Sequence, residues 1–96
     1  MRNKEFCEMF VSNENGKYNG KKCNSMHISE DGNKIFSYGT CLAQRLSNGT
    51  YVVNDTKYSV TTSRQQTMLN HALRFANTMY LKNKIPMWTK DLRMYL

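Results

Sequence analysis

Four tight-turn signals divide the first half of this chain into short segments, and they constrain its fold more than any other feature. They are Asn15-Gly16, Asn19-Gly20, Asp31-Gly32 and Asn48-Gly49. Such pairs accept the positive φ angles of type I′ turns, so each indicates a hairpin where strand-like residues flank it. The strand-like segments are residues 6–11, 26–28, 34–38, 40–46, 50–53 and 57–60. This half therefore predicts a small antiparallel β-meander of four to six short strands, with a mobile polar loop at residues 13–24.

The hydrophobic period changes to that of a helix after residue 60. Hydroxyl side chains at Thr61, Thr62 and Ser63 can accept the free N–H groups of a helix start, and Pro86 is a helix breaker. Apolar residues then recur at helical spacing. They are Met68, Leu69, Ala72, Leu73, Phe75, Ala76, Met79 and Tyr80. We predict one long amphipathic helix over residues 63–82, followed by a short C-terminal helix or a docked tail at residues 83–96.

Length and composition favour one small α+β domain spanning residues 1–96. Hydrophobic residues make up 40% of the chain and charged residues 22%, which is typical of globular domains. No apolar run has the roughly 20 residues of a membrane span, and no apolar stretch follows the basic N-terminus as in a signal peptide. Three cysteines at unrelated spacings fit reduced thiols. We therefore expect a cytoplasmic protein.

Positive charge is concentrated in the second half of the chain. The formal net charge is +7, and residues 56–96 hold seven Lys or Arg side chains against the lone Asp91. No carboxylate occurs between Asp55 and Asp91. This distribution indicates a polyanionic or acidic partner, although a basic protein that is merely soluble is the alternative.

One side of the predicted helix carries hydrogen-bonding residues without a negative charge. Lys and Arg can contact phosphates while Asn side chains reach base edges, and a helix start attracts anions. Trp88 belongs to an apolar tail that either covers the core or docks on a protein partner. The candidate binding residues are Lys57, Thr62, Ser63, Arg64, Asn70, His71, Arg74, Lys82 and Trp88.

Catalytic, cofactor and metal sites are not predicted. Cys7, Cys23 and Cys41 have no spacing that places them beside His27 or His71, and no glycine-rich phosphate loop is present. Zinc sites normally need two close ligand pairs, and this chain has at most one. Aromatic side chains on the sheet could stack on unpaired bases, although aromatic residues in strands more often belong to the core. These are Phe36, Tyr38, Tyr51 and Tyr58.

Two segments carry a resemblance to small proteins of bacteriophages and mobile elements. They are Ser37-Tyr38-Gly39-Thr40-Cys41-Leu42-Ala43 and Thr56-Lys57-Tyr58-Ser59-Val60-Thr61-Thr62-Ser63-Arg64-Gln65-Gln66. The segments are similar to a "SYxTxxA" strand and a "TKYSxTTS" helix start in those proteins, which often carry His near the position of Gln65. The resemblance implies a phage-type protein that acts in the host cytoplasm by binding nucleic acid or by inhibiting host machinery.

The leading hypothesis is a non-catalytic phage-type protein that binds nucleic acid, or a complex that handles nucleic acid, through a basic helix face. The first alternative is a protein–protein inhibitor of a host defence system, such as an anti-CRISPR factor. The second alternative is a structural or virion-associated protein. The sequence leaves the oligomeric state open.

Overall fold

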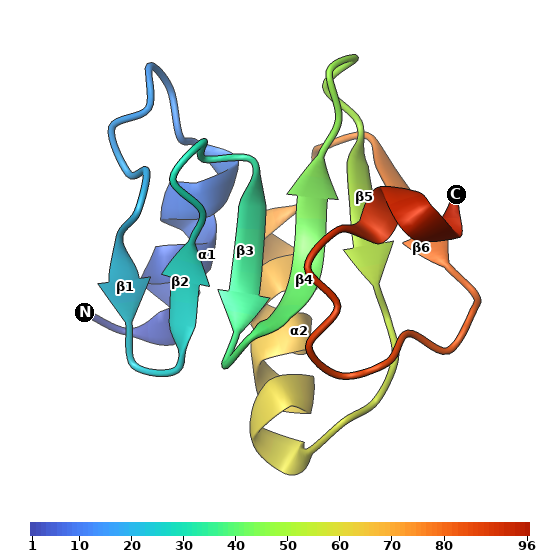
Figure 1. Ribbon diagram of the computed structural model, residues 1–96. Helices are drawn as coiled ribbons and strands as arrows, with labels where there is room; N and C mark the ends of the chain where they lie inside the picture. Colours follow the sequence, from blue (N-terminus) through green and yellow to red (C-terminus); the bar gives the residue numbers. More distant parts are fainter.

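The computed structural model describes all 96 residues and contains one six-stranded mixed sheet with two α-helices (Figure 1). The strands lie in chain order, and neighbours are antiparallel except for the last pair, which is parallel. The elements are α1 (Asn3–Val11), β1 (Lys22–Cys23), β2 (Met26–Ile28), β3 (Lys34–Ser37), β4 (Thr40–Arg45), β5 (Tyr51–Asn54), α2 (Val60–Ala72), β6 (Thr78–Leu81) and a 3-10 helix, η1 (Leu92–Tyr95). The α+β class is confirmed. The antiparallel meander is confirmed for β1–β5. The sheet as a whole is mixed, because α2 provides the crossover that a parallel sixth strand requires.

None of the helices combines the length and the apolar character that a membrane span requires.

Two of the four turn signals close hairpins of the sheet. Gly32 (φ 77°) lies between β2 and β3, and Gly49 (φ 86°) lies between β4 and β5. Gly16 and Gly20 also have positive φ angles, but they lie in turns that precede β1 and join no strands. β1 itself lies within residues 13–24, where we expected only a loop.

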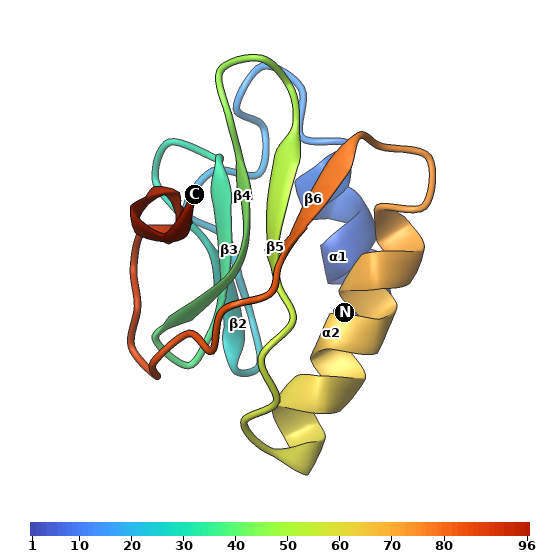
Figure 2. The same ribbon diagram turned by 90° about the vertical axis from the view of Figure 1, so that its right-hand side faces the viewer.

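Residues 6–11 belong to α1, so the strand predicted there is wrong. Phe6, Cys7 and Phe10 are buried. A half-buried strand would bury every second residue, whereas a helix brings residues three and four apart to one face, as Cys7 and Phe6 are from Phe10. α1 packs against α2, and both helices cover the same face of the sheet (Figure 2). The imperfect alternation of this segment is therefore a helical pattern.

The long helix predicted over residues 63–82 is also wrong. α2 begins earlier, at Val60, because Ser59 Oγ accepts a hydrogen bond from the backbone N–H of Thr62 at 3.1 Å. It ends at Ala72, and the chain then turns back to form β6 beside β5. The β-branched and aromatic residues of β6 suit a strand, and pairing with β5 satisfies their backbone groups.

The large apolar residues in the second half of the predicted helix are consequently exposed. Leu69 and Leu73 are buried in the core, as a core-facing helix side requires. Phe75, Met79 and Tyr80 are 91%, 47% and 44% exposed. The predicted amphipathic pattern therefore holds only along α2.

The main core lies between the two helices and the sheet. Phe10 of α1 meets Tyr51 of β5 edge to face, with ring centroids 5.8 Å apart. The buried members of this core are Phe6, Cys7, Phe10, Cys23, Met26, Ile28, Ile35, Leu42, Ala43, Tyr51, Val53, Leu69, Ala72 and Leu73. It joins residues of α1 and of the C-terminal part of α2 to five of the six strands.

The segment after β6 crosses the opposite face of the sheet (Figure 2). Its backbone is tied to β4, because Cys41 N–H donates to Thr89 O at 2.9 Å and Leu92 N–H donates to Gln44 Oε1 at 2.8 Å. Leu92 is fully buried in a second cluster. The other buried members are Phe36, Cys41, Val52, Leu81 and Ile85. No C-terminal α-helix forms, since η1 is a 3-10 helix of four residues.

Asp91 caps η1 and gives the fold a pH-dependent contribution. It accepts hydrogen bonds from Gln44 Nε2 and from Arg93 N–H, each at 3.0 Å, and Arg93 Nη2 lies 2.8 Å from its Oδ2. These donors, the Arg93 side chain first, hold the pKa of Asp91 well below its usual range. A carboxyl with a depressed folded-state pKa stabilises the fold above its unfolded-state pKa, and this contribution is lost as the pH falls below about 4.

We expect Asp91→Asn to lower the free energy of unfolding by about 1 kcal/mol at neutral pH. The difference from the unsubstituted protein should shrink as the pH falls below about 4, because protonated Asp91 is neutral like Asn. Urea denaturation of both proteins across pH measures this. Asp55→Asn is the control, since Asp55 makes only an exposed ion pair with Lys57 at 3.9 Å. A difference that stays constant at every pH would contradict the assignment.

Candidate nucleic-acid interface

A cleft of about 470 Å³ opens where the β3–β4 turn, the start of α2 and the segment after β6 meet. We call it the aromatic cleft. Its lining residues are Ser37, Tyr38, Thr40, Tyr58, Ser59, Thr61, Thr62, Met87 and Trp88. None of them is charged. A volume in the range of about 300–1,000 Å³ and a lining of rings with a few hydroxyls are typical of small-ligand sites.

Two aromatic residues of the cleft have a left-handed backbone. Tyr38 has φ 58° and Trp88 has φ 68°, and each is 62% exposed. This conformation costs a residue with a Cβ roughly 1–2 kcal/mol, and the exposed rings recover little of it by burial. Hydrogen bonds hold both residues in place: Tyr38 N–H donates to Ser25 O at 2.7 Å, and Trp88 N–H donates to Thr40 Oγ1 at 2.8 Å. Strained residues held in this way cluster at functional sites.

Gly39 allows Trp88 to lie directly against the β3–β4 turn. A Cβ built on Gly39 would come within 2.3 Å of Cε3 of Trp88, which is closer than real contacts allow. Lys90 Nζ donates to Gly39 O at 2.6 Å and lies 5.6 Å from the centre of the Trp88 ring. That distance is within the range of cation–π attraction. The Trp88 ring is therefore held beside the turn although most of its surface is open to solvent.

Tyr58 connects two walls of the cleft. Its hydroxyl donates to Ile85 O at 2.5 Å and accepts from Asn54 Nδ2 at 2.9 Å. Residues 55–59 therefore run as an unpaired connection from β5 to α2, and the strand predicted at residues 57–60 is wrong. No neighbouring strand pairs with this segment. Side chains bond its backbone instead, as where Gln66 Nε2 donates to Thr56 O.

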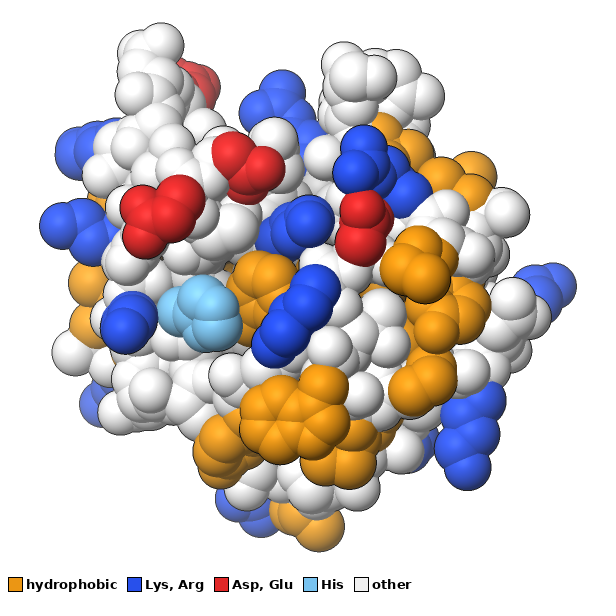
Figure 3. Space-filling model, in the orientation of Figure 1, with side chains coloured by type: hydrophobic (Ala, Val, Ile, Leu, Met, Phe, Trp, Pro, Cys, Tyr) orange, Lys and Arg blue, Asp and Glu red, His pale blue; other side chains and the backbone are white.

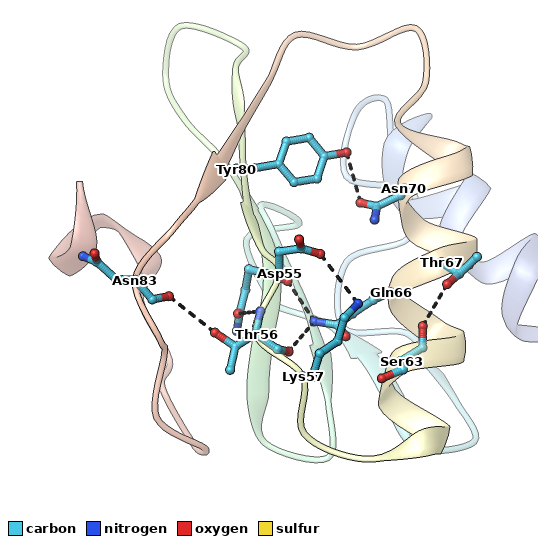
Figure 4. A network of polar contacts seen from close by, with 10 residues as sticks. Asp55, Thr56, Lys57, Ser63, Gln66, Thr67, Asn70, Tyr80 and Asn83 are labelled. Atoms are coloured by element: carbon cyan, nitrogen blue, oxygen red, sulfur yellow. Dashed lines mark hydrogen bonds and ion pairs between the residues drawn. The ribbon is translucent and has the colours of Figure 1, made fainter.

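Two buried glutamines position the start of α2. Gln65 accepts a hydrogen bond from Ser37 Oγ and donates to Ser25 Oγ at 2.7 Å. Gln66 Nε2 donates to Asn54 O at 2.9 Å and to Thr56 O at 2.8 Å (Figure 4). These bonds fix the first turns of α2 against β3 and against the β5–α2 connection. The cleft walls are thus supported from the protein interior.

Five of the predicted binding residues gather around the start of α2. Thr62 and Trp88 line the aromatic cleft. Lys57, Ser63 and Arg64 line an adjoining hollow that shares Tyr58 and Ser59 with it. Thr62 is 5% exposed, and its hydroxyl accepts from Ser59 Oγ at 3.1 Å, so it supports the cleft more than it offers a free donor.

The other four predicted residues do not share this place. Asn70, His71 and Arg74 lie near the opposite end of α2, where Arg74 Nη1 lies 3.4 Å from Glu8 Oε1. Asn70 Oδ1 accepts from the Tyr80 hydroxyl at 3.2 Å, as Figure 4 shows. Lys82 follows β6 and is not on a helix. A single basic helix face without acids is therefore not formed, because the predicted helix ends early and α1 brings Glu8 beside it.

The sheet face opposite the helices carries charges of both signs. Figure 3 shows acidic side chains interspersed with basic ones on this face and hydrophobic ones along its lower edge. His27 stacks on Phe36 with ring centroids 4.6 Å apart, and Lys90 Nζ lies 5.7 Å from the Phe36 ring. Burial, with Lys22 and Lys90 nearby, lowers the pKa of His27. Sequence reasoning did not select His27 or Lys90 for binding.

The four aromatic candidates for base stacking have different surroundings. Phe36 and Tyr51 are 7% and 6% exposed and belong to the two hydrophobic clusters. Tyr58 is half-buried with its hydroxyl bonded, and Tyr38 is exposed. Of these four, only Tyr38 is therefore exposed enough to stack on a ligand. Trp88, which was not among the four, is equally exposed.

The cysteines are free and buried. Burial raises the pKa of the Cys7 and Cys41 thiols to about 12 each. A nucleophilic thiolate requires a shift in the opposite direction. No three His, Cys, Asp or Glu side chains lie together as a metal site would need.

A model of one protein family, described as a family of unknown function (DUF8033), matches residues 7–89. This range runs from α1 through the sheet and α2 to Trp88 and Thr89. No curated protein and no solved structure matches the chain.

Proposed function

The chain belongs to the DUF8033 family, whose function is unknown, and we propose that it is a non-catalytic protein of phage type that binds nucleic acid or a nucleoprotein complex. The binding surface is the start of α2 together with the aromatic cleft and its basic surroundings. The raised thiol pKa values of Cys7 and Cys41 disfavour either of them as a nucleophile.

One observation carries this proposal: the cations of two adjoining hollows, one at the start of α2 and one beside the end of β6, are almost free of carboxylates. Arg64, Lys82 and Lys84 have no Asp or Glu oxygen within 4 Å, and Lys57 meets only exposed Asp55 at 3.9 Å. Lys57, Lys82 and Lys84 line one hollow, which adjoins the hollow of Lys57 and Arg64. Cations that are not neutralised within the protein attract phosphates and release counterions from them on binding.

Binding should therefore weaken steeply with salt. For duplex DNA, the logarithm of the association constant should fall against the logarithm of salt concentration with a slope of about −0.9 per phosphate contact. The double variant Lys57→Gln/Arg64→Gln should reduce that slope by about two and weaken binding at low salt. Fluorescence anisotropy with labelled DNA over a salt series measures both quantities.

A matched control removes the same number of positive charges from another part of the surface. Lys17 and Lys21 are exposed and lie in the segment between α1 and β1. This segment loops above β1 in Figure 1, whereas α2 begins at the bottom of the view. Lys17→Gln/Lys21→Gln should leave the salt slope nearly unchanged. Equal losses in the two double variants would mean that only net charge matters, and binding that ignores salt would overturn the proposal.

Inhibition of a host defence protein by direct docking is the second candidate, and an exposed apolar margin favours it. The side chains of Met87, Trp88, Met94 and Leu96 are 59–77% exposed and lie on the segment after β6. Figure 3 shows hydrophobic side chains along this side of the sheet face. A pull-down from host lysate, repeated after nuclease treatment, separates the two functions, because a complex held by nucleic acid is lost and a direct protein complex remains.

A further inference from the structure

We propose that the aromatic cleft takes an unpaired nucleobase, stacked against Tyr38 and Trp88, so that the ligand of this surface is single-stranded nucleic acid. This inference rests on the proposed function and names its ligand class. The lining of the cleft, its backbone conformation and its charged surroundings support it independently of one another.

The lining suits a nucleobase, and it does not suit a phosphate or a charged side chain of a peptide. All nine lining residues are neutral, and they combine three aromatic rings and a methionine with five hydroxyl side chains. An unpaired base presents a flat apolar face with polar edges, so rings can stack on it while the exposed hydroxyls of Ser59 and Thr61 meet its edges. The other three lining hydroxyls are buried and bonded within the protein. A base within a duplex already has its two faces covered by its neighbours and cannot enter.

The backbone at Tyr38 and Trp88 shows that ring exposure is maintained by the fold. Each residue has a positive φ angle, and each keeps 62% of its surface exposed. Both are held by backbone hydrogen bonds to other parts of the chain, at 2.7 Å and 2.8 Å. Rings that served only the core would be buried, and a turn that served only the hairpin would favour glycine in place of Tyr38.

The surroundings supply the charges that a nucleic-acid backbone requires. Lys57 and Arg64 line the hollow that adjoins one wall, and Lys90 lies 5.6 Å from the Trp88 ring. A neutral aromatic site between cations is the arrangement that binds single strands, because the bases stack while the phosphates follow the positive charge. The cations also distinguish this cleft from an apolar socket for a protein side chain.

Trp88 makes the test direct, because it is the single tryptophan of the chain. We expect oligothymidylate or oligouridylate to quench its fluorescence and to bind at least roughly tenfold more tightly than a duplex of the same length at the same salt. Quenching by either oligonucleotide supports the inference, since both present the same stacking chemistry. Trp88→Ala should weaken single-strand binding by roughly tenfold, as the loss of one stacking ring does, and weaken duplex binding much less, so that the preference for the single strand is lost.

Tyr38→Gly keeps the inference testable if Trp88→Ala fails to fold. Glycine adopts the positive φ angle freely, so the midpoint of thermal unfolding should not fall, while single-strand affinity should drop by roughly tenfold. Trp88→Phe keeps a flat ring and should retain part of the affinity. Met94→Ala is the control, because Met94 is 77% exposed and does not line the cleft.

The outcomes separate this inference from the proposed function. Equal affinity for single strand and duplex, with loss only in Lys57→Gln/Arg64→Gln, overturns the stacking site and leaves nucleic-acid binding standing. Absence of binding to any oligonucleotide at low salt overturns both. A purified protein ligand whose binding needs Trp88, without any oligonucleotide binding, also overturns both and favours the docking function.

Discussion

Phe6→Ala should lower the free energy of unfolding by roughly 3–5 kcal/mol, the usual loss when a buried Phe is truncated. Phe6 is fully buried in the main core, where α1 packs against α2 and the sheet. Domains of this size have a stability of roughly 5–15 kcal/mol, so this loss is a large fraction of the total. Urea denaturation followed by circular dichroism measures the loss.

Lys4→Ala is the matched control on the same helix, because Lys4 is exposed and its replacement should change the stability by less than about 0.5 kcal/mol. Glu8→Pro adds a test of the helix itself. Proline in the middle of α1 should cost roughly 3 kcal/mol or more, since it removes a backbone donor and clashes with the preceding turn. A variant with Pro at position 8 that is as stable as the parent would show that residues 3–11 are not helical.

The second large effect is expected at Leu92, in the segment that covers the other face of the sheet. Leu92→Ala should lower the free energy of unfolding by roughly 2–5 kcal/mol, because it leaves a cavity in the second hydrophobic cluster. Met94→Ala in the same 3-10 helix should have almost no effect, since Met94 is 77% exposed. Equal stability of Leu92→Ala and Met94→Ala would mean that the tail is not docked on the sheet.

The burial of Leu92 also decides which variants can be used to test binding. Deleting residues 86–96 would remove Leu92 and the hydrogen bonds to Cys41 and Gln44, so the second cluster would be opened to water. Loss of binding after such a truncation would not distinguish a contact residue from a folding defect. Single substitutions at exposed Trp88 or Tyr38 avoid this difficulty.

Local signals predicted the middle of the sheet correctly. The turns at Gly32 and Gly49 have positive φ angles, which Asp-Gly and Asn-Gly pairs predict, and strand-like residues flank both turns. The charge distribution is likewise a property of the sequence, and the fold places Lys57, Ser63 and Arg64 together because they are close along the chain.

Elements whose identity depends on a distant partner were predicted wrongly. Phe6–Phe10 is consistent with a strand or a helix until α2 is placed beside it, because short apolar segments carry an ambiguous period. Residues 78–81 continue a helical pattern in sequence, yet the open edge of β5 pairs with them as β6. Backbone hydrogen bonding to an available strand outweighs a weak helical preference there.

The sequence by itself determined the α+β class, the two central hairpins and a C-terminal half without acids between residues 56 and 90. These follow from turn chemistry, periodicity and charge, which act between residues near in the chain. Only the tertiary structure decided that Tyr38 and Trp88 share one cleft and that Arg74 is paired with Glu8. Residues far apart in sequence meet there because packing of the helices and the tail on opposite faces of the sheet brings them together, and no local pattern encodes such a meeting.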